Sequence, residues 1–283
     1  MRLAHLLRAI YSDVWLVTPE KHHQIQELVK LKLTMARQDF QARDREIEIS
    51  GEKVLLDSMS IEDGVARIPF AGVMVKGAGS FEKWAGAIAH ADIEADVQEA
   101  LASKEVKAIF FDVDSPGGTA AGSFELADLV AYASKRKETM AWVEGQCCSA
   151  AFLALSGCDM IYGSKTSEVG AVECYLALLD SSAAYAAQGL KVDVIANTGG
   201  THVGAGMPGT SLSEDQRAEF QHSVDYLYGL YVNHLEKVRP DVPKSAMDGR
   251  TFLGKEAVKV KMLDACTTKA QALSDLRSWA GLD

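Results

Sequence analysis

The sequence predicts an α/β fold in which mostly parallel strands alternate with helices. Two apolar, β-rich runs, 107–112 and 139–143, each follow a segment of helical periodicity, at about 92–101 and 123–134. A helix between two strands returns the chain to the same end of the sheet, so the strands pair in parallel. With 283 residues, 48% of them hydrophobic, the chain can bury a core of the size that this layered fold requires.

The other elements are expected to surround this centre. Residues 1–45 have a helical pattern with an apolar face, and we expect an N-terminal helical arm followed by one domain over residues 46–283. The face consists of Ile25, Leu28, Val29 and Leu31. Further strands are expected near 47–56, 65–74, 160–162 and 176–179, a helix is expected to start at Ser149, and a long helix to span 212–238.

Composition excludes several classes of function. The formal net charge of −10, without a basic patch interleaved with aromatic residues, argues against a nucleic-acid partner. No apolar run approaches the roughly 20 residues that cross a bilayer, so no membrane anchor is expected. Five cysteines, an odd number without zinc-type spacing, favour a reducing, cytoplasmic setting, and we predict neither a metal site nor a cofactor.

A glycine pair follows the first of the two β-rich runs. The turn 114–118 reads Asp-Ser-Pro-Gly-Gly, so the chain leaves the strand with backbone N–H groups exposed at Gly117 and Gly118. Glycine has no Cβ to keep a ligand away, and amides aimed at one point stabilise the negative oxygen that forms in acyl transfer. The turn therefore predicts an oxyanion hole.

A candidate nucleophile follows the second run. Ser149 precedes the small, apolar residues Ala150–Leu155, which places it at a strand-to-helix turn beside the first amides of a helix. The simpler interpretation of each motif alone is structural, with Ser149 as a helix cap and the glycines as a tight turn.

Both motifs resemble those of the signal peptide peptidase A family of serine peptidases, in particular its bacteriophage capsid-maturation proteases. The resemblance rests on five segments and covers nearly the whole chain: 15–19, 66–73, 114–118, 148–152 and 249–257. It implies a Clp-protease/crotonase-like superhelix, a serine peptidase domain over residues 46–283, and cleavage of extended polypeptides. It assigns Ser149 as the nucleophile and the N–H groups of Gly117 or Gly118 and of Ala150 as the oxyanion hole.

The chain departs from the family at the general base. The family's catalytic lysine stands in a Gly-x-x-Lys-x-x-Gly-x-Pro context, which residues 200–208 match with Val203 at the lysine position. Valine accepts no proton, so either the dyad is lost, naturally or by an engineered change, or another group replaces the lysine. His202 is the alternative base with a suitable pKa, although neighbours on an extended segment point to opposite faces.

Other groups near the motifs have simpler interpretations. Lys191, before an expected strand at 192–195, and Lys165, in a turn, are most simply solvated charges, and Cys148 is most simply a packing thiol. Glu173 stands where the family has a small or apolar residue beside the substrate groove; we expect it to face solvent, and the alternative is that it enters the cleft.

The resemblance also implies partners and a setting. It implies polypeptide substrates, including phage scaffold, portal or capsid proteins, and a homo-oligomer, because the chain carries one copy of a unit that longer members carry twice. The expected location is the host cytoplasm or the phage procapsid. The rival hypothesis, supported by Val203, is a catalytically inactive protein with a structural role in assembly.

Overall fold

The computed structural model of the chain describes residues 14–16, 40–43, 46–49, 52–55, 58–78, 83 and 86–282. The predicted apolar face of the N-terminal arm, at residues 25–31, lies outside the described residues. Within the predicted arm the chain forms two short strands, at Trp15–Leu16 and Phe40–Arg43, so it is not helical at those positions. The division into an arm and a domain stays a prediction.

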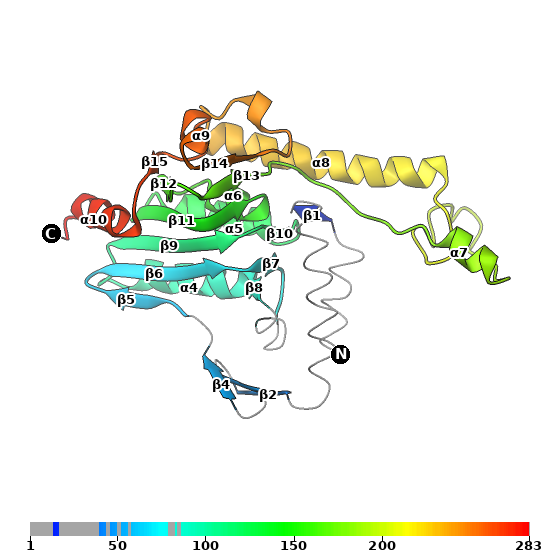
Figure 1. The fold of residues 1–283 in the computed structure, drawn as a ribbon, viewed down its shortest axis with the longest axis horizontal. Helices are drawn as coiled ribbons and strands as arrows, with labels where there is room; N and C mark the ends of the chain where they lie inside the picture. The colour runs from blue at the N-terminus through cyan, green and yellow to red at the C-terminus, as the bar shows by residue number, and fades with distance from the viewer. Residues whose placement is uncertain are drawn as a thin grey trace.

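The body of the molecule is an eight-stranded sheet (Figure 1). Its order is β14-β13-β11-β9-β6-β5, and β12 pairs with β11 and β15. The neighbours of β9 and β11 are all parallel to them, as the alternation of strand and helix predicts. At the edges, β5 pairs with β6 and β14 pairs with β13, both in antiparallel fashion. The strands are β5 Ser60–Glu62, β6 Val65–Ala71, β9 Ala108–Ser115, β11 Glu138–Cys148, β12 Met160–Gly163, β13 Glu168–Gly170, β14 Thr251–Leu253 and β15 Ala265–Cys266.

Helices cover the central strands on both faces. Side chains alternate across β9: Ile109, Phe111 and Val113 join the larger buried cluster with helices α4, α5 and α6, whereas Phe110 packs in a second cluster with α10. The helices are α4 His90–Ala102, α5 Ser123–Ala133, α6 Ala150–Leu155, α9 Gly254–Lys259 and α10 Lys269–Trp279. Burial on both faces explains why these strands are apolar throughout, and the predicted α/β fold is confirmed.

A second sheet lies beside the end of β9, where the chain turns at Gly117. Its order is β1-β10-β7-β8, in which β10 pairs with β7 in parallel and with β1 in antiparallel fashion. The strands are β1 Trp15–Leu16, β7 Val73–Val75, β8 Ala87–Ala89 and β10 Gly118–Thr119. A third, antiparallel sheet consists of β2 Phe40–Arg43, β3 Glu46–Ile49 and β4 Glu52–Leu55.

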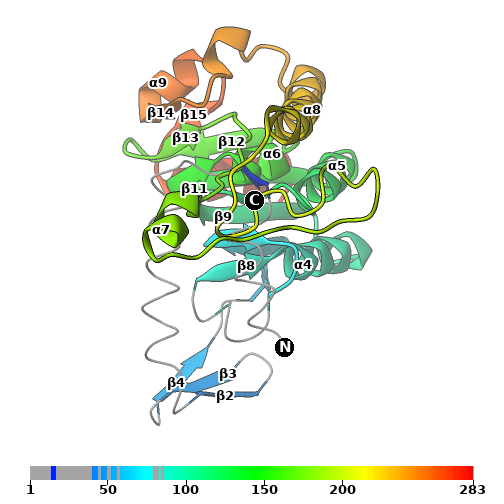
Figure 2. The same cartoon turned by 90° about the vertical axis from the view of Figure 1, so that its right-hand side faces the viewer.

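A long helix, α8, spans Glu214–Val238 and confirms the predicted helix at 212–238. Ser213 caps it, with a reciprocal capping box to Gln216. Only Tyr231 and Leu235 of this helix are buried, both near its C-terminal end. Its N-terminal end extends beyond the body together with α7, Ser182–Ala187 (Figures 1 and 2). We call residues 176–212 the projecting segment.

Two predicted strands are wrong, and both lie in the projecting segment. Residues 176–179 and 192–195 form no strand in the structure. Their apolar and β-branched side chains suit a pleated sheet, but strand propensity acts mainly through packing against neighbouring strands. Ile195 instead is 95% exposed. None of the helices that the structure describes combines the length and the hydropathy needed to cross a bilayer.

Candidate active site

Ser149 lies where β11 ends and α6 begins, as the sequence predicts. Its φ of 53° and ψ of −115° are unusual for a residue with a side chain. The main chain is bonded on both sides: the Ser149 N–H donates to Gly170 O at 2.7 Å, and Ser149 O accepts from the Tyr231 hydroxyl at 2.7 Å and from Leu153 N at 2.9 Å. These bonds offset the cost of the strained turn.

The Ser149 hydroxyl forms no hydrogen bond in the described structure. Ser149 is completely buried, and its Oγ has no partner among the residues whose positions are described. A buried hydroxyl without a partner costs about 1–3 kcal/mol, so its presence calls for an explanation other than packing. A reacting group that meets its partner only when substrate is bound is one such explanation.

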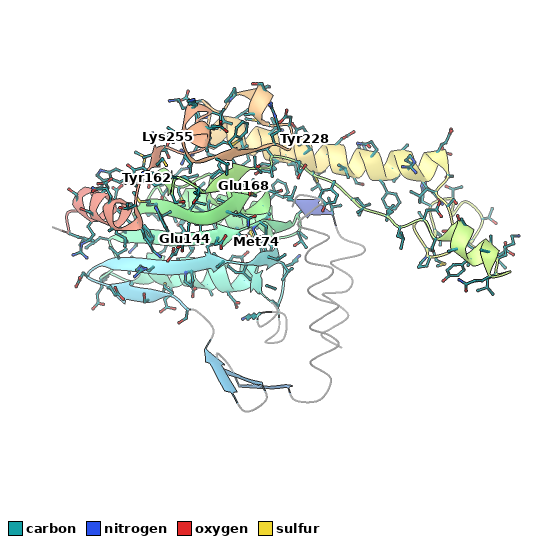
Figure 3. The ribbon with its side chains drawn as sticks, viewed as in Figure 1. Met74, Glu144, Tyr162, Glu168, Tyr228 and Lys255 are labelled. Atoms are coloured by element: carbon teal, nitrogen blue, oxygen red, sulfur yellow. The ribbon has the colours of Figure 1, made fainter. Side chains whose placement is uncertain are left out.

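Gly117 brings the predicted oxyanion turn against Ser149. Its φ is +105°, and a Cβ built there would lie 2.8 Å from Cys148 O and 3.1 Å from Ala150 N. Only glycine allows this approach. The Gly117 N–H makes a long contact of 3.3 Å to Ser115 Oγ, and Met74, labelled in Figure 3, donates its N–H to Gly117 O at 2.9 Å. The structure therefore brings Ser149, Gly117 and Ala150 together.

Gly118 is the next residue, in β10. It pairs with Met74 on one side and with Leu16 on the other, and a Cβ there would lie 1.9 Å from Met74 O. Its requirement for glycine thus comes from close strand packing, and of the two glycines Gly117 lies nearer to the Ala150 amide.

A bulge between β9 and β11 sets the direction of the chain just before Ser149. The register between these strands shifts between Val143 and Cys147. Asp114 occupies the bulge, with Oδ1 accepting from Gln146 N at 3.0 Å, and a Cβ at Gly145 would lie 2.4 Å from that oxygen. Asp114 therefore joins the glycine turn to the segment that carries Ser149.

Val203 and His202 lie elsewhere. Both are exposed, in a series of turns at 200–206 within the projecting segment, where Val203 N donates to Gly200 O. Val203 is 55% exposed. The structure therefore does not bring position 203 or His202 to Ser149 of the same chain. Lys191 is likewise exposed and pairs with Asp193 at 2.9 Å.

Glu173 does enter the protein, so the expectation that it faces solvent is wrong. It follows β13, whose Gly170 accepts the Ser149 N–H, and Ala171 N donates to Arg250 O. Burial raises the pKa of Glu173 to about 7, and its Oε1 is inaccessible and without a partner among the described residues. Gly249 gives it room, because a Cβ there would lie 2.6 Å from Glu173 Oε2.

Both neighbouring thiols are buried. Burial raises the pKa of Cys147 well above its ordinary value, and Cys148 Sγ contacts Glu168 O at 3.5 Å. A thiol needs its thiolate form to attack, so the packing interpretation of these cysteines is favoured. Tyr231, by contrast, was not singled out by any motif. It lies on the long helix predicted at 212–238, and nothing in the sequence pattern indicates its bond to Ser149 O.

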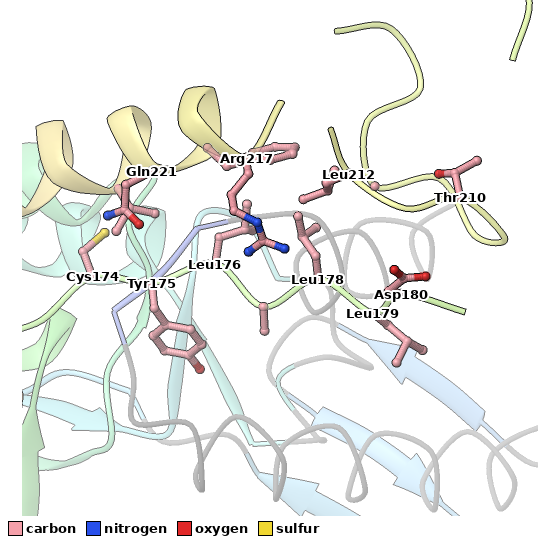
Figure 4. Close-up of a pocket in the computed structure, with 14 residues that line it drawn as sticks. Cys174, Tyr175, Leu176, Leu178, Leu179, Asp180, Thr210, Leu212, Arg217 and Gln221 are labelled. Carbon is pink, nitrogen blue, oxygen red and sulfur yellow. The ribbon is translucent and has the colours of Figure 1, made fainter. Parts of the chain in front are cut away.

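A groove continues from Glu173 between the extended chain at 174–180 and the N-terminal half of α8 (Figure 4). It has a volume of about 520 Å³ and is lined largely by apolar side chains, with Arg217 and Gln221 on the helix side. Tyr228, labelled in Figure 3, lies on the same helix and donates its hydroxyl to Met247 O. The groove could hold part of an extended chain, although Ser149 is not among its lining residues.

Known proteins are similar to this chain along most of its length. The head-tail preconnector protein GP5 of Enterobacteria phage P21 is 23% identical over 96% of the chain and 56% of its own length. The capsid assembly protease C of Escherichia phage lambda is 25% identical over 78% of the chain and 50% of its own length. The chain thus spans about half the length of these relatives.

Two further matches are a curated protein and a solved structure. The putative protease MJ0651 of Methanocaldococcus jannaschii is 26% identical over 62% of the chain and 57% of its own length. Among solved structures, a putative enoyl-CoA hydratase/isomerase from Acinetobacter baumannii has a TM-score of 0.44 and 13% identity, covering 80% of this chain and 81% of that one.

The family comparison is more direct. The model of Peptidase family S49 matches residues 131–283, which include Ser149, Glu173 and α8. This is more than half of the chain, and it takes in both the strand that ends at the candidate nucleophile and the helix that supports it. The chain belongs to peptidase family S49.

Proposed function

We propose that this chain is a serine endopeptidase that processes polypeptides during phage head assembly, with Ser149 as its nucleophile. The observation that carries the proposal is the meeting of Ser149, Gly117 and the Ala150 amide at the end of β11. Membership of family S49 supports the reaction class, and the printed names of the two phage relatives support the setting.

The chemistry follows from this arrangement. The Ser149 hydroxyl attacks the carbonyl carbon of a peptide bond, and the carbonyl oxygen gains negative charge in the tetrahedral intermediate. The N–H groups of Gly117 and Ala150 are the donors that we assign to that oxygen, with Gly118 holding the turn in place. Removing one such donor typically costs about 10²–10³ in kcat.

For the proton acceptor we propose Glu173. Position 203 carries no titratable group, whereas Glu173 has a raised pKa and an unpartnered, inaccessible oxygen. Its segment follows Gly170, which accepts the Ser149 N–H. Burial is the main cause of the raised pKa of Tyr231, whose hydroxyl holds Ser149 O, and the Glu173 carboxylate adds a smaller contribution. A base with a pKa near the working pH is well suited to accept the serine proton.

The expected substrates are extended polypeptides. The groove beside α8 and the edge of β10 are the surfaces along which such a chain could dock through its main chain. By analogy with the phage relatives, we propose scaffold, portal or capsid proteins as partners, assembly as a homo-oligomer, and a location in the host cytoplasm or the procapsid. We also propose that residues 46–283 form the peptidase domain.

The alternative function is an inactive assembly protein, which Val203 favours. The test is labelling of Ser149 by a fluorophosphonate and turnover of peptide libraries by the wild-type, Ser149→Ala, Glu173→Gln and Val203→Lys proteins. The proposal expects labelling of the wild type, none in Ser149→Ala, and a loss of at least about tenfold in Glu173→Gln. Labelling only in Val203→Lys would establish the inactive alternative, and equal labelling of Glu173→Gln would remove Glu173 as the base.

A further inference from the structure

A segment of the chain's own N-terminal region lies along the strand that leaves the oxyanion turn. Trp15 pairs with Thr119 and Leu16 with Gly118, in antiparallel register, and Ala120 N donates to Val14 O at 3.0 Å. The other edge of β10 is taken by β7. Residues 14–16 therefore occupy the edge of β10 to which another extended peptide could add.

Leu16 places a peptide carbonyl next to the amides assigned to the oxyanion. Leu16 O lies 2.3 Å from the point where a Cβ of Gly117 would stand, and Ala150 N lies 3.1 Å from the same point. The carbonyl of Leu16 and the first amide after Ser149 thus face one small space, which exists because residue 117 is glycine. A substrate carbonyl has to reach this region to be attacked.

The apolar surroundings of Leu16 define what this position accepts. Leu16 is completely buried and belongs to the same cluster as Ala150, Ala151 and Phe152 of α6. A charged side chain there would be buried without a partner at high cost. Ser149 is completely buried in this arrangement, in which residues 14–16 are paired with β10.

We propose that residues 14–16 occupy, within the same chain, the part of the substrate groove that holds the residues before the cleaved bond, with Leu16 at the position that Ser149 attacks. The inference rests on the proposed function and makes it more specific. The substrate class is an extended peptide with an uncharged, apolar residue of the size of leucine at that position. Such a peptide binds only when residues 14–16 leave β10.

The test compares Ser149→Ala with Ser149→Ala/Leu16→Asp, both as full-length chains that cannot turn over a peptide. The probe is a blocked peptide with the sequence of residues 12–18, and its matched control carries aspartate in place of the leucine. Because an occupied site lowers apparent affinity by the fraction that is open, we expect the double variant to bind the leucine peptide at least about tenfold more tightly. The aspartate peptide should bind neither protein.

Hydrogen exchange shows whether the variant has opened or unfolded. In the double variant the Ala120 amide should exchange faster, while amides of β9 and β11 stay protected. If Leu16→Asp exposes β9 and β11 as well, Leu16→Ser replaces it in the same comparison. Equal binding of the leucine peptide to both proteins, or equal binding of the two peptides, overturns the inference.

Labelling of Ser149 by a fluorophosphonate separates the inference from the function on which it rests. If the leucine peptide binds as expected but Ser149 is never labelled in the wild-type or Leu16→Asp protein, the peptidase proposal fails and the occupied groove stands. Labelling at the same rate in both proteins, together with equal peptide binding, retains the peptidase and overturns the inference.

Discussion

The region around Ser149 and the projecting segment differ in what fixes their structure. In the first, every residue of α6 is buried, and the main chain of Ser149 is bonded to two other elements. In the second, large apolar side chains are exposed: Leu179, Leu190, Val194, Ile195, Val203 and Met207. Packing therefore fixes the backbone of Ser149, the proposed nucleophile. Val203, which the family resemblance puts at the position of the base, lies in a segment with little packing of its own.

The largest difference in stability is expected between alanine substitutions at two glycines with similar φ, one in each region. Gly117→Ala should cost about 3 kcal/mol or more, because a methyl group would meet Leu16 O in a left-handed conformation. Gly199→Ala, in the projecting segment, has nothing within 4 Å and should cost only about 1 kcal/mol of strain. Urea denaturation of both variants measures this, and similar costs would contradict the comparison.

A smaller effect is expected from the tyrosine that holds Ser149. Tyr231→Phe removes the donor to Ser149 O and should lower the free energy of unfolding by about 1–2 kcal/mol. The control is Tyr226→Phe on the same helix, where the ring is 61% exposed and the change should stay within about 0.5 kcal/mol. If both variants lose the same amount, the bond to Ser149 contributes nothing specific.

Glu173 predicts a dependence of stability on pH. Its pKa is about 7 in the folded protein against an ordinary value of 4.5, so the folded state keeps a proton that the unfolded state has released. The contribution of this proton to the free energy of unfolding is complete below pH 4.5 and is lost as the pH rises to about 7. The stability of Glu173→Gln relative to wild type should therefore increase over this range. Melting temperatures from pH 4 to 8 provide the check, and a constant difference would refute the raised pKa.

The smallest effect is expected at the tip of the projecting segment. Ile195 is 95% exposed, so Ile195→Ala should change the free energy of unfolding by less than about 0.5 kcal/mol. Urea denaturation at two protein concentrations measures this change and shows whether it depends on association between chains. A larger, concentration-dependent loss would mean that a second copy of the chain covers this side chain in solution.

The same contrast explains what the sequence could predict. The strands at 107–112 and 139–143, their helices and the turn at Ser149 follow from periodicity and turn chemistry, because burial on both faces leaves a strong pattern. The strands expected at 176–179 and 192–195 had suitable residues but no neighbouring strand, which a pattern cannot reveal. Glu173 was misjudged for a related reason: a lone carboxylate carries no sign of the space that Gly249, 76 positions later in the sequence, leaves for it.

The three hydrogen bonds to the main chain of Ser149 have a consequence for its motion. The N–H is held by Gly170 O, and the carbonyl oxygen by Tyr231 and by the first turn of α6. With φ and ψ fixed in this way, the hydroxyl retains one degree of freedom, rotation about χ1, which has three staggered minima. Once residues 14–16 have left β10, as proposed above, the Ser149 Oγ turns toward a bound peptide by a single change of rotamer, and the backbone of Ser149 itself stays in place.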